Sequence, residues 1–162
     1  TRPGSLDPGA VIYLMEIEKL SLEEVSHILY CESGLKGVSG VSPDPRELLP
    51  READEPRARL ALDMYVRRIV REIGALTSVL GGLDMLVFTA GVGEHNATIR
   101  ERVCADLAWL GVELDPQANA ASRKTLSSMS SSVLVVMEPT NEEWIAARHA
   151  QSFLSSNAMA NL

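Results

Sequence analysis

Apolar residues recur along much of the chain at spacings of three and four, and two short apolar runs interrupt this pattern. The clearest helical pattern covers residues 55–80 and ends at Gly81-Gly82, with one apolar face formed by Leu62, Tyr65, Val66, Ile69, Val70, Ile73, Leu76 and Leu80. The unbroken runs at residues 85–89 and 133–137 are typical of strands buried on both faces. On the long helix we expect Ile69, Ile73 and Leu76 to be buried.

Capping residues place further helices. Asp7 followed by Pro8 indicates a helix start. Ser21 with Glu24 three residues later matches a capping box, whose helix should run to about residue 31. The same spacing between Thr140 and Glu143 predicts a capping box for the last helix.

The remaining segments complete an α/β pattern. Residues 36–51 contain three Pro and two Gly with little periodicity, which predicts a long ordered loop. The order helix, strand, helix, strand, helix predicts one α/β domain with parallel strands over residues 1–154. Residues 155–162 are expected to form a tail, either disordered or derived from a tag. Because the chain begins with Thr1 and not Met, we expect it to be a piece of a longer protein.

Charge and composition exclude some classes of function. The 162 residues carry a formal net charge of -7, and a chain without a basic block is a poor candidate for binding nucleic acid or an anionic membrane. The arginines at 67, 68 and 71 lie at helical spacing and predict a solvent-facing helix surface. No apolar run approaches the ~18 residues of a membrane span. Cys31 and Cys104 are expected to be buried thiols of a cytoplasmic protein.

The strongest candidate for chemistry follows the first strand. The segment Gly91-Val92-Gly93-Glu94-His95 would place bare backbone amides at the carboxyl edge of a sheet, where ligands bind in open α/β folds. A lone Gly-x-Gly is more often a plain tight turn than a ligand site, and the absence of a following Lys excludes a P-loop. His95 fits either a helix start or a ligand contact.

Three further sites have both a functional and an ordinary interpretation. Glu142 could help bind Mg²⁺ together with substrate phosphates, or simply favour the first turn of a helix. Asp44 and Arg46, on either side of Pro45, could hold a ribose and flank an adenine, or form a solvated ion pair. Arg2 on its own would be a terminal charge.

Four motifs together resemble the acetate kinase family. Residues 1–9, Thr-Arg-Pro-Gly-Ser-Leu-Asp-Pro-Gly, are similar to the family's Thr-Arg-Ser-Gly-Asp-Ile-Asp-Pro-Gly. Residues 33–42 resemble its Ser-Gly-Leu-x-Gly-x-Ser-Gly-x-Ser segment. Residues 88–94, Phe-Thr-Ala-Gly-Val-Gly-Glu, and 139–143, Pro-Thr-Asn-Glu-Glu, resemble its two later motifs. All four stand in the family's order.

The resemblance implies an actin-like, sugar-kinase-type ATPase domain of the ribonuclease H-like kind, forming the C-terminal half of a two-domain enzyme. That enzyme would convert ATP and acetate to ADP and acetyl phosphate with Mg²⁺, or with Mn²⁺, as a homodimer. By matching motif, Arg2 would stabilise the transferring phosphoryl group, and Glu142 would help hold the metal. Residues 44–46 and 91–95 would form the adenosine site.

Within the motifs that carry the resemblance, the sequence departs from the family pattern at two positions. Pro3 replaces a Ser, and His95 stands where Asn is common. No stretch matches the family's N-terminal half, with its phosphate-binding strand, catalytic aspartate and substrate arginine, so the isolated chain is expected to be inactive. A propionate or butyrate kinase shares these motifs, and a non-catalytic nucleotide-binding or dimerisation module is the alternative of a different class.

Overall fold

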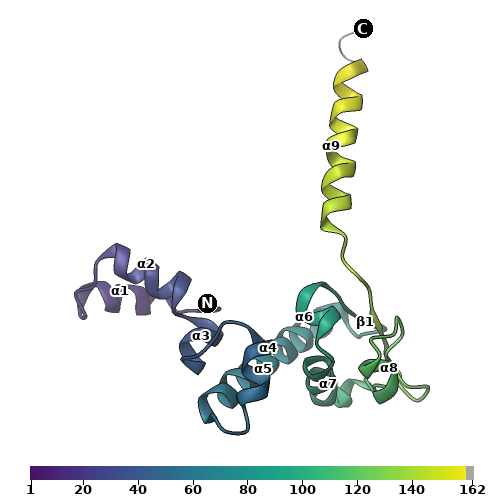
Figure 1. Ribbon diagram of the computed structural model, residues 1–162, viewed down its shortest axis with the longest axis horizontal. Coiled ribbons are helices and arrows are strands. Elements are labelled where there is room, and N and C mark those ends of the chain that lie inside the picture. Colours follow the sequence, from purple (N-terminus) through teal and green to yellow (C-terminus); the bar gives the residue numbers. More distant parts are fainter. Residues whose placement is uncertain (160–162) are drawn as a thin grey trace.

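The computed structural model describes residues 1–159, with the side chains of residues 1–141 and 143–153. Figure 1 shows helices flanking a short sheet, and the elements follow in the order α1 (Pro8–Glu16), α2 (Leu22–Cys31), α3 (Gly34–Ser39), α4 (Pro45–Leu48), the 3₁₀ turn η1 (Leu49–Arg51), α5 (Pro56–Leu80), β1 (Met85–Phe88), α6 (Ala90–His95), α7 (Ala97–Asp106), the 3₁₀ turn η2 (Ala108–Leu110), α8 (Pro116–Ala120), β2 (Leu134–Met137) and α9 (Glu142–Met159). Helix α9 includes residues 155–159 of the expected tail, and residues 160–162 lie outside the described part.

The expected helix starts are confirmed. Asp7 caps α1, with its carboxylate accepting a hydrogen bond of 2.7 Å from the Gly9 amide. Ser21 and Glu24 form both halves of the capping box of α2. Helix α5 ends at Gly81, whose φ of 78° is the left-handed conformation that ends many helices.

The long loop predicted for residues 36–51 is wrong. Most of it is helical, in α3, α4 and η1. Two of the three prolines that suggested a loop instead begin short helices, since Pro45 occupies the first turn of α4 behind its cap Asp44 and Pro50 lies at the start of η1. Gly40, with a φ of 73°, ends α3 and makes the turn toward α4.

Strands β1 and β2 are neighbours and run parallel, as predicted. Met85 pairs with Leu134, and the register continues to Phe88 opposite Met137. The prediction that both strands are buried on both faces is wrong, because Met85 and Val87 of β1 are 49% and 46% exposed and Leu134 of β2 is 40% exposed. In the described chain, therefore, one face of β1 is covered and the other is not.

The hydrophobic core lies where α5 packs against α3, α4 and α7. Leu62 is fully buried there, and Ile69 and Ile73 pack against its edge. The expected burial of Leu76 is wrong, since its side chain is 61% exposed. The next buried residue after Ile73 on this face of α5 is Thr77, four positions later. Leu76, three positions after Ile73, lies to one side of the buried face.

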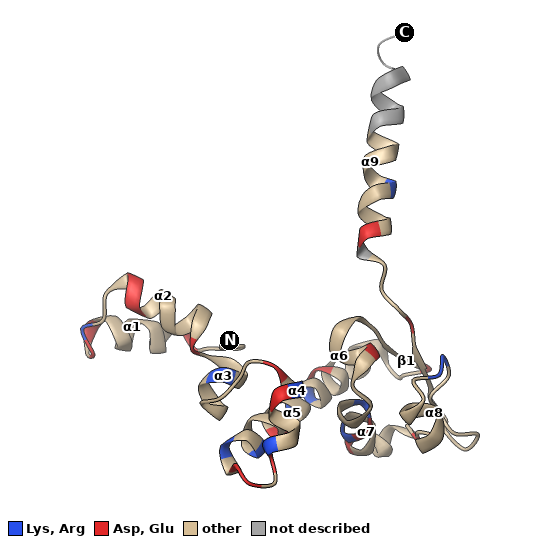
Figure 2. Cartoon of the chain, viewed as in Figure 1, with Lys and Arg blue, Asp and Glu red and all other residues tan. Residues whose placement is uncertain are grey.

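The two ends of the chain extend away from this core. Figure 1 shows α1 and α2 together at one end, and α9 projecting from the body. Figure 2 shows acidic and basic residues interspersed along the helices, as expected from the sequence. Within residues 1–159, none of the helices combines the length and the hydrophobicity that crossing a bilayer requires.

The two cysteines have different environments. Cys104 is buried, and burial raises the pKa of its thiol to about 12, so this thiol stays protonated near neutral pH. The expected burial of Cys31 is wrong, because that residue is exposed on α2. Both are free thiols in the structure.

Candidate nucleotide-binding site

The two motif segments that follow the strands leave the same edge of the sheet. Strands β1 and β2 are parallel, so their carboxyl ends lie side by side. The Glu138 amide donates a hydrogen bond of 2.9 Å to the Phe88 carbonyl, which keeps the two chains paired as they leave the sheet. Residues 89–95 and 139–142 are therefore neighbours, although about 50 positions separate them in the sequence.

The segment of Gly91, Val92, Gly93, Glu94 and His95 is not a loop but the body of helix α6. The helix turns back directly over the strand that precedes it. A Cβ at Gly93 would lie 3.3 Å from the Phe88 backbone carbon, closer than most such contacts. Glycine thus allows the close approach of helix and strand here.

The carboxylate of Glu94 joins the two segments. Its Oε1 accepts hydrogen bonds of 2.8 Å from the Thr140 amide and 2.9 Å from the Thr140 hydroxyl. The amide bond is the larger cause, and the hydroxyl bond the second, of a lowered pKa for Glu94. The group is therefore an anion near neutral pH. His95, the neighbour of Glu94, is exposed.

A buried arginine supports α6 from the inside. Arg100 of α7 has no exposed surface, and its Nη1 donates hydrogen bonds of 2.9 Å and 2.8 Å to the carbonyls of Gly93 and Glu94. Its Nε and Nη2 bind the Asn119 side chain and carbonyl, each at 2.8 Å, and Nη2 also donates to the Ser122 hydroxyl at 3.0 Å. Among the described residues, none of its partners is a carboxylate. Burial lowers the pKa of Arg100 from its very high ordinary value.

The start of α9 differs from the prediction. The Thr140–Glu143 capping box is wrong, because Asn141 caps the helix, with its Oδ1 accepting 2.9 Å from the Trp144 amide. The Thr140 hydroxyl is instead bound to Glu94. Glu142 begins α9, and its side chain lies outside the described residues. Its expected metal role stays a prediction.

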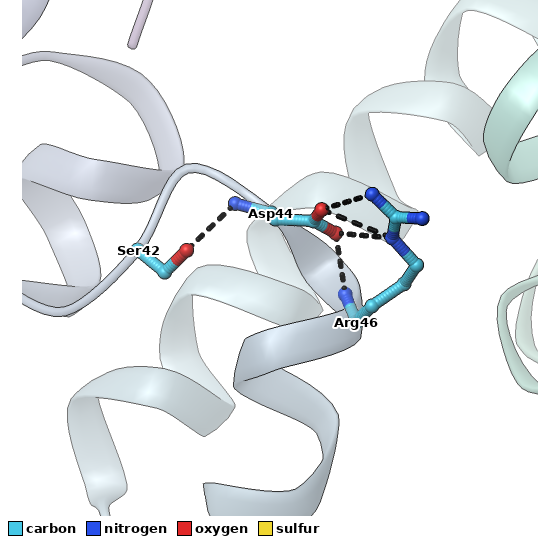
Figure 3. Close-up of polar contacts among 3 residues, drawn as sticks. All are labelled: Ser42, Asp44 and Arg46. Atoms are coloured by element: carbon cyan, nitrogen blue, oxygen red, sulfur yellow. Dashed lines mark hydrogen bonds and ion pairs between the residues drawn. The ribbon is translucent and has the colours of Figure 1, made fainter.

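Asp44 and Arg46 bind each other, as Figure 3 shows. The Asp44 carboxylate accepts from the Arg46 amide at 2.8 Å and from Arg46 Nε at 3.0 Å, and the Asp44 amide donates to the Ser42 hydroxyl at 3.1 Å. The hydrogen bond from the Arg46 side chain, followed by that from its amide, lowers the pKa of Asp44. Pro45 is buried between them, whereas the Arg46 side chain is 74% exposed. In this state, therefore, the pair is the exposed ion pair that the sequence offered as its alternative.

Close packing of its backbone against Gly34 fixes the position of Arg2. A Cβ at Gly34, whose φ is 60°, would lie 2.6 Å from the Arg2 carbonyl oxygen, so only glycine permits this packing. The guanidinium carbon lies 5.9 Å from the centre of the Tyr30 ring. Arg2 also lines a cavity of about 710 Å³ with the α5 arginines at positions 67, 68 and 71. That part of α5 is solvent-facing, as predicted, and Arg68 also binds the Ser5 hydroxyl at 2.8 Å.

The two expected walls of the adenosine site belong to different elements of one core. Helix α4 packs on α5, α6 packs on α7, and α5 packs on α7. Arg100, Asn119 and the bridging role of Thr140 were not predicted from the sequence. A signal for Arg100 was present, because it lies three and four positions before Val103 and Cys104 on the buried face of α7.

In residues 1–141 and 143–153, no three side chains of His, Cys, Asp or Glu come together as a metal-binding cluster. Mg²⁺ is commonly held by one or two carboxylates together with substrate phosphates and water. One carboxylate at position 142 fits that requirement.

Comparison with known proteins gives consistent matches to acetate kinases. The model of the acetokinase family matches residues 1–148. An acetate kinase of Methylocella silvestris is 48% identical over 160 residues, which cover 99% of this chain and 39% of that protein. The crystal structure of Porphyromonas gingivalis acetate kinase superposes with a TM-score of 0.84 at 40% identity, covering 95% of this chain and 40% of that one.

A propionate kinase also matches. The crystal structure of the enzyme from Francisella tularensis has a TM-score of 0.81 and 33% identity, over 88% of this chain and 37% of that one.

The fold and the site thus define an α/β domain of the actin-like ATPase class. The chain belongs to the acetokinase family, and it spans about two-fifths of the length of the curated relatives it matches.

Proposed function

We propose that this chain is the C-terminal, nucleotide-binding part of an acetate kinase, which transfers phosphate from ATP to acetate and forms ADP and acetyl phosphate. One observation carries the proposal beyond family membership. Glu94 and Thr140, from two motifs far apart in sequence, hydrogen-bond at the carboxyl edge of parallel strands. Open α/β sheets bind their ligands at that edge.

Each predicted site residue has a role in phosphoryl transfer. The transition state of this reaction carries its negative charge on the peripheral phosphate oxygens, so it is stabilised by fixed cations. Arg2 would supply one such cation, since its backbone is fixed against Gly34 and the residue lines a cavity. Glu142 would hold a Mg²⁺, or Mn²⁺, whose chemistry is to neutralise charge on the phosphates. Asp44, Pro45, Arg46 and residues 91–95 would line the adenosine site.

Exposed apolar surface supports a larger assembly. Ile12, Ile17 and Leu22 of the α1–α2 pair are more than half exposed, and so are Trp144 and Phe153 of α9. Large apolar side chains that gather on a surface are typical of protein interfaces. We therefore expect the rest of a two-domain enzyme and a second copy of it to cover these surfaces, in a cytoplasmic homodimer.

The second candidate function is that of a propionate kinase, which would use a different acyl acceptor. The observation in its favour is the structural match to the Francisella tularensis enzyme. The two candidates differ only in the length of the acyl chain that the acceptor site admits. A comparison of kcat/KM for acetate, propionate and butyrate in the full-length enzyme distinguishes them.

The central test is the change Arg2→Ala in the full-length enzyme. We expect turnover to fall by roughly 10²- to 10³-fold, because a preorganised charge-stabilising donor is lost. The KM for ATP should stay near its original value, since the guanidinium acts on the transferred group and not on adenosine. Acetyl phosphate trapped as its hydroxamate measures the rate. Unchanged turnover would remove the catalytic role proposed for Arg2.

The isolated 162-residue chain gives a second test. We expect it to form no acetyl phosphate from acetate, ATP and Mg²⁺, because the phosphate-binding strand and catalytic aspartate of the family are not in it. Circular dichroism should first establish that the chain is folded, and added N-terminal half should restore turnover. Turnover by the chain alone, abolished by Glu142→Ala, would mean that one domain holds a complete site.

A further inference from the structure

A continuous series of hydrogen bonds links Arg100 to Thr140 through α6. The guanidinium is fixed from one side by α8 and the residues after it, through Asn119 and Ser122. From the other side it binds the carbonyls of Gly93 and Glu94, the last residues of α6 before His95. The Glu94 side chain then binds Thr140, two residues before Glu142.

The donor geometry of Arg100 explains why this residue can hold the helix. The last carbonyls of a helix lack a partner inside the helix. A guanidinium offers five N–H donors in one rigid plane, so it can bind α6 and α8 at the same time. A lysine ammonium at this position has three donors at a single point and cannot span both elements.

We propose that Arg100 is a positioning residue of the nucleotide site, which holds α6 by its terminal carbonyls and thereby sets Glu94 to join the two site segments through Thr140. This inference rests on the proposed function, because it assigns how the nucleotide site is built. Arg100 itself is fully buried, so it acts through the carbonyls of α6 that it binds. The Glu94 carboxylate binds Thr140 and so orients the segment of residues 139–142.

The test compares two arginines of α7 in the full-length enzyme. Arg100→Lys keeps the charge but loses the planar fork, and Arg102→Lys makes the same change two positions further on. Arg102 binds Glu52, and among the described residues no hydrogen bond or ion pair joins its side chain to α6. We expect Arg100→Lys to raise the Kd for ADP by about tenfold, measured by calorimetry, and Arg102→Lys to leave it unchanged. The KM for acetate should not change in either variant.

A second pair of variants tests the other end of the connection at an exposed position, where misfolding is not expected. Thr140→Val removes the hydroxyl at nearly constant shape, and Thr140→Ser keeps it. We expect Thr140→Val to weaken ADP binding several-fold and Thr140→Ser to bind as the wild type does. In the double variant with Arg100→Lys the two losses should be less than additive, because both act through Glu94.

The outcomes separate the inference from the function. If the wild-type enzyme binds ADP and both Arg100→Lys and Thr140→Val, shown to be folded, bind it equally well, Arg100 has only a structural role and the inference is overturned. If Arg100→Lys does not fold, unaltered binding by Glu94→Ala, which loses both hydrogen bonds to Thr140, overturns it. If the wild-type enzyme binds neither ADP nor ATP, the proposed function fails first and the inference with it.

Discussion

The two expected walls of the adenosine site, α6 and the Asp44–Arg46 segment, are stabilised by different kinds of interaction. Helix α6 is held in place by hydrogen bonds from Arg100, whose guanidinium is fully buried. The Asp44–Arg46 segment is stabilised at the surface by its own ion pair, and the Arg46 side chain is 74% exposed. One wall therefore depends on a buried network and the other on a pair that water can reach.

This difference indicates which wall can respond to a ligand. An exposed ion pair contributes little to stability, since water and salt compete for both charges. Arg46 can thus leave Asp44 for a nucleotide with little loss. The bonds of Arg100 cannot be exchanged so easily, because their acceptors are buried or partly buried and would remain unsatisfied. We infer that α6 is already in its binding arrangement and that the Asp44–Arg46 segment adjusts.

The largest expected effect comes from removing the buried arginine. Arg100→Ala deletes hydrogen bonds to four residues and leaves a cavity among α6, α7 and α8. We expect the free energy of unfolding to fall by roughly 3 kcal/mol or more, as for other buried networks that lose one partner. Urea denaturation measures this change. The matched variant Arg102→Ala, which loses a partly exposed pair with Glu52, should lower it by only about 1 kcal/mol.

An equal loss in the two variants would break the comparison. It would mean that the internal fastening of α6 contributes no more than a pair near the surface. The difference between the two values is the informative quantity, because both variants shorten an arginine on the same helix.

A smaller effect should appear in the pH dependence of stability. The two hydrogen bonds from Thr140 hold the pKa of Glu94 below its ordinary value. A carboxylate with a lowered folded pKa stabilises the protein above its unfolded pKa, and this contribution is lost as the pH falls through the folded pKa. We therefore expect the unfolding temperature of the wild type to fall more steeply below about pH 5 than that of Glu94→Gln. Identical slopes in thermal melts would show that Glu94 does not titrate with folding.

Local patterns in the sequence were sufficient for most of the fold. Capping residues and apolar spacing predicted α1, α2, α5 and the two parallel strands, because each signal acts within a few residues. The error at residues 36–51 has the same local origin, since proline reads as a loop former even where it begins a short helix, as Pro45 does. The exposure of Met85 could not be read locally, because burial depends on what covers the strand.

The candidate site was predicted less completely. Family resemblance indicated the segments at 44–46 and 91–95, but it did not show that Asp44 and Arg46 bind each other or that the second segment is helical. Arg100 was missed because a charged residue in a helical pattern is usually assigned to the solvent face. Its role depends on Asn119, 19 positions away along the chain, and no pattern within one helix reveals that contact.

The smallest expected effect concerns Arg46, and it separates binding from folding. Arg46→Ala removes the exposed half of the ion pair, but the Asp44 carboxylate keeps its bond to the amide of residue 46 and still caps α4. The midpoint of thermal unfolding should therefore stay within about 1 °C of the wild-type value, as is usual for exposed pairs. If this segment is the wall that adjusts, the Kd for ADP should rise a few-fold, and the rise should shrink at high salt, where the charge is screened. Calorimetric titration at low and high NaCl concentration, beside a thermal melt, measures both quantities. A large fall in the midpoint would show that the Asp44–Arg46 segment is fastened as firmly as α6, and the contrast between the two walls would disappear.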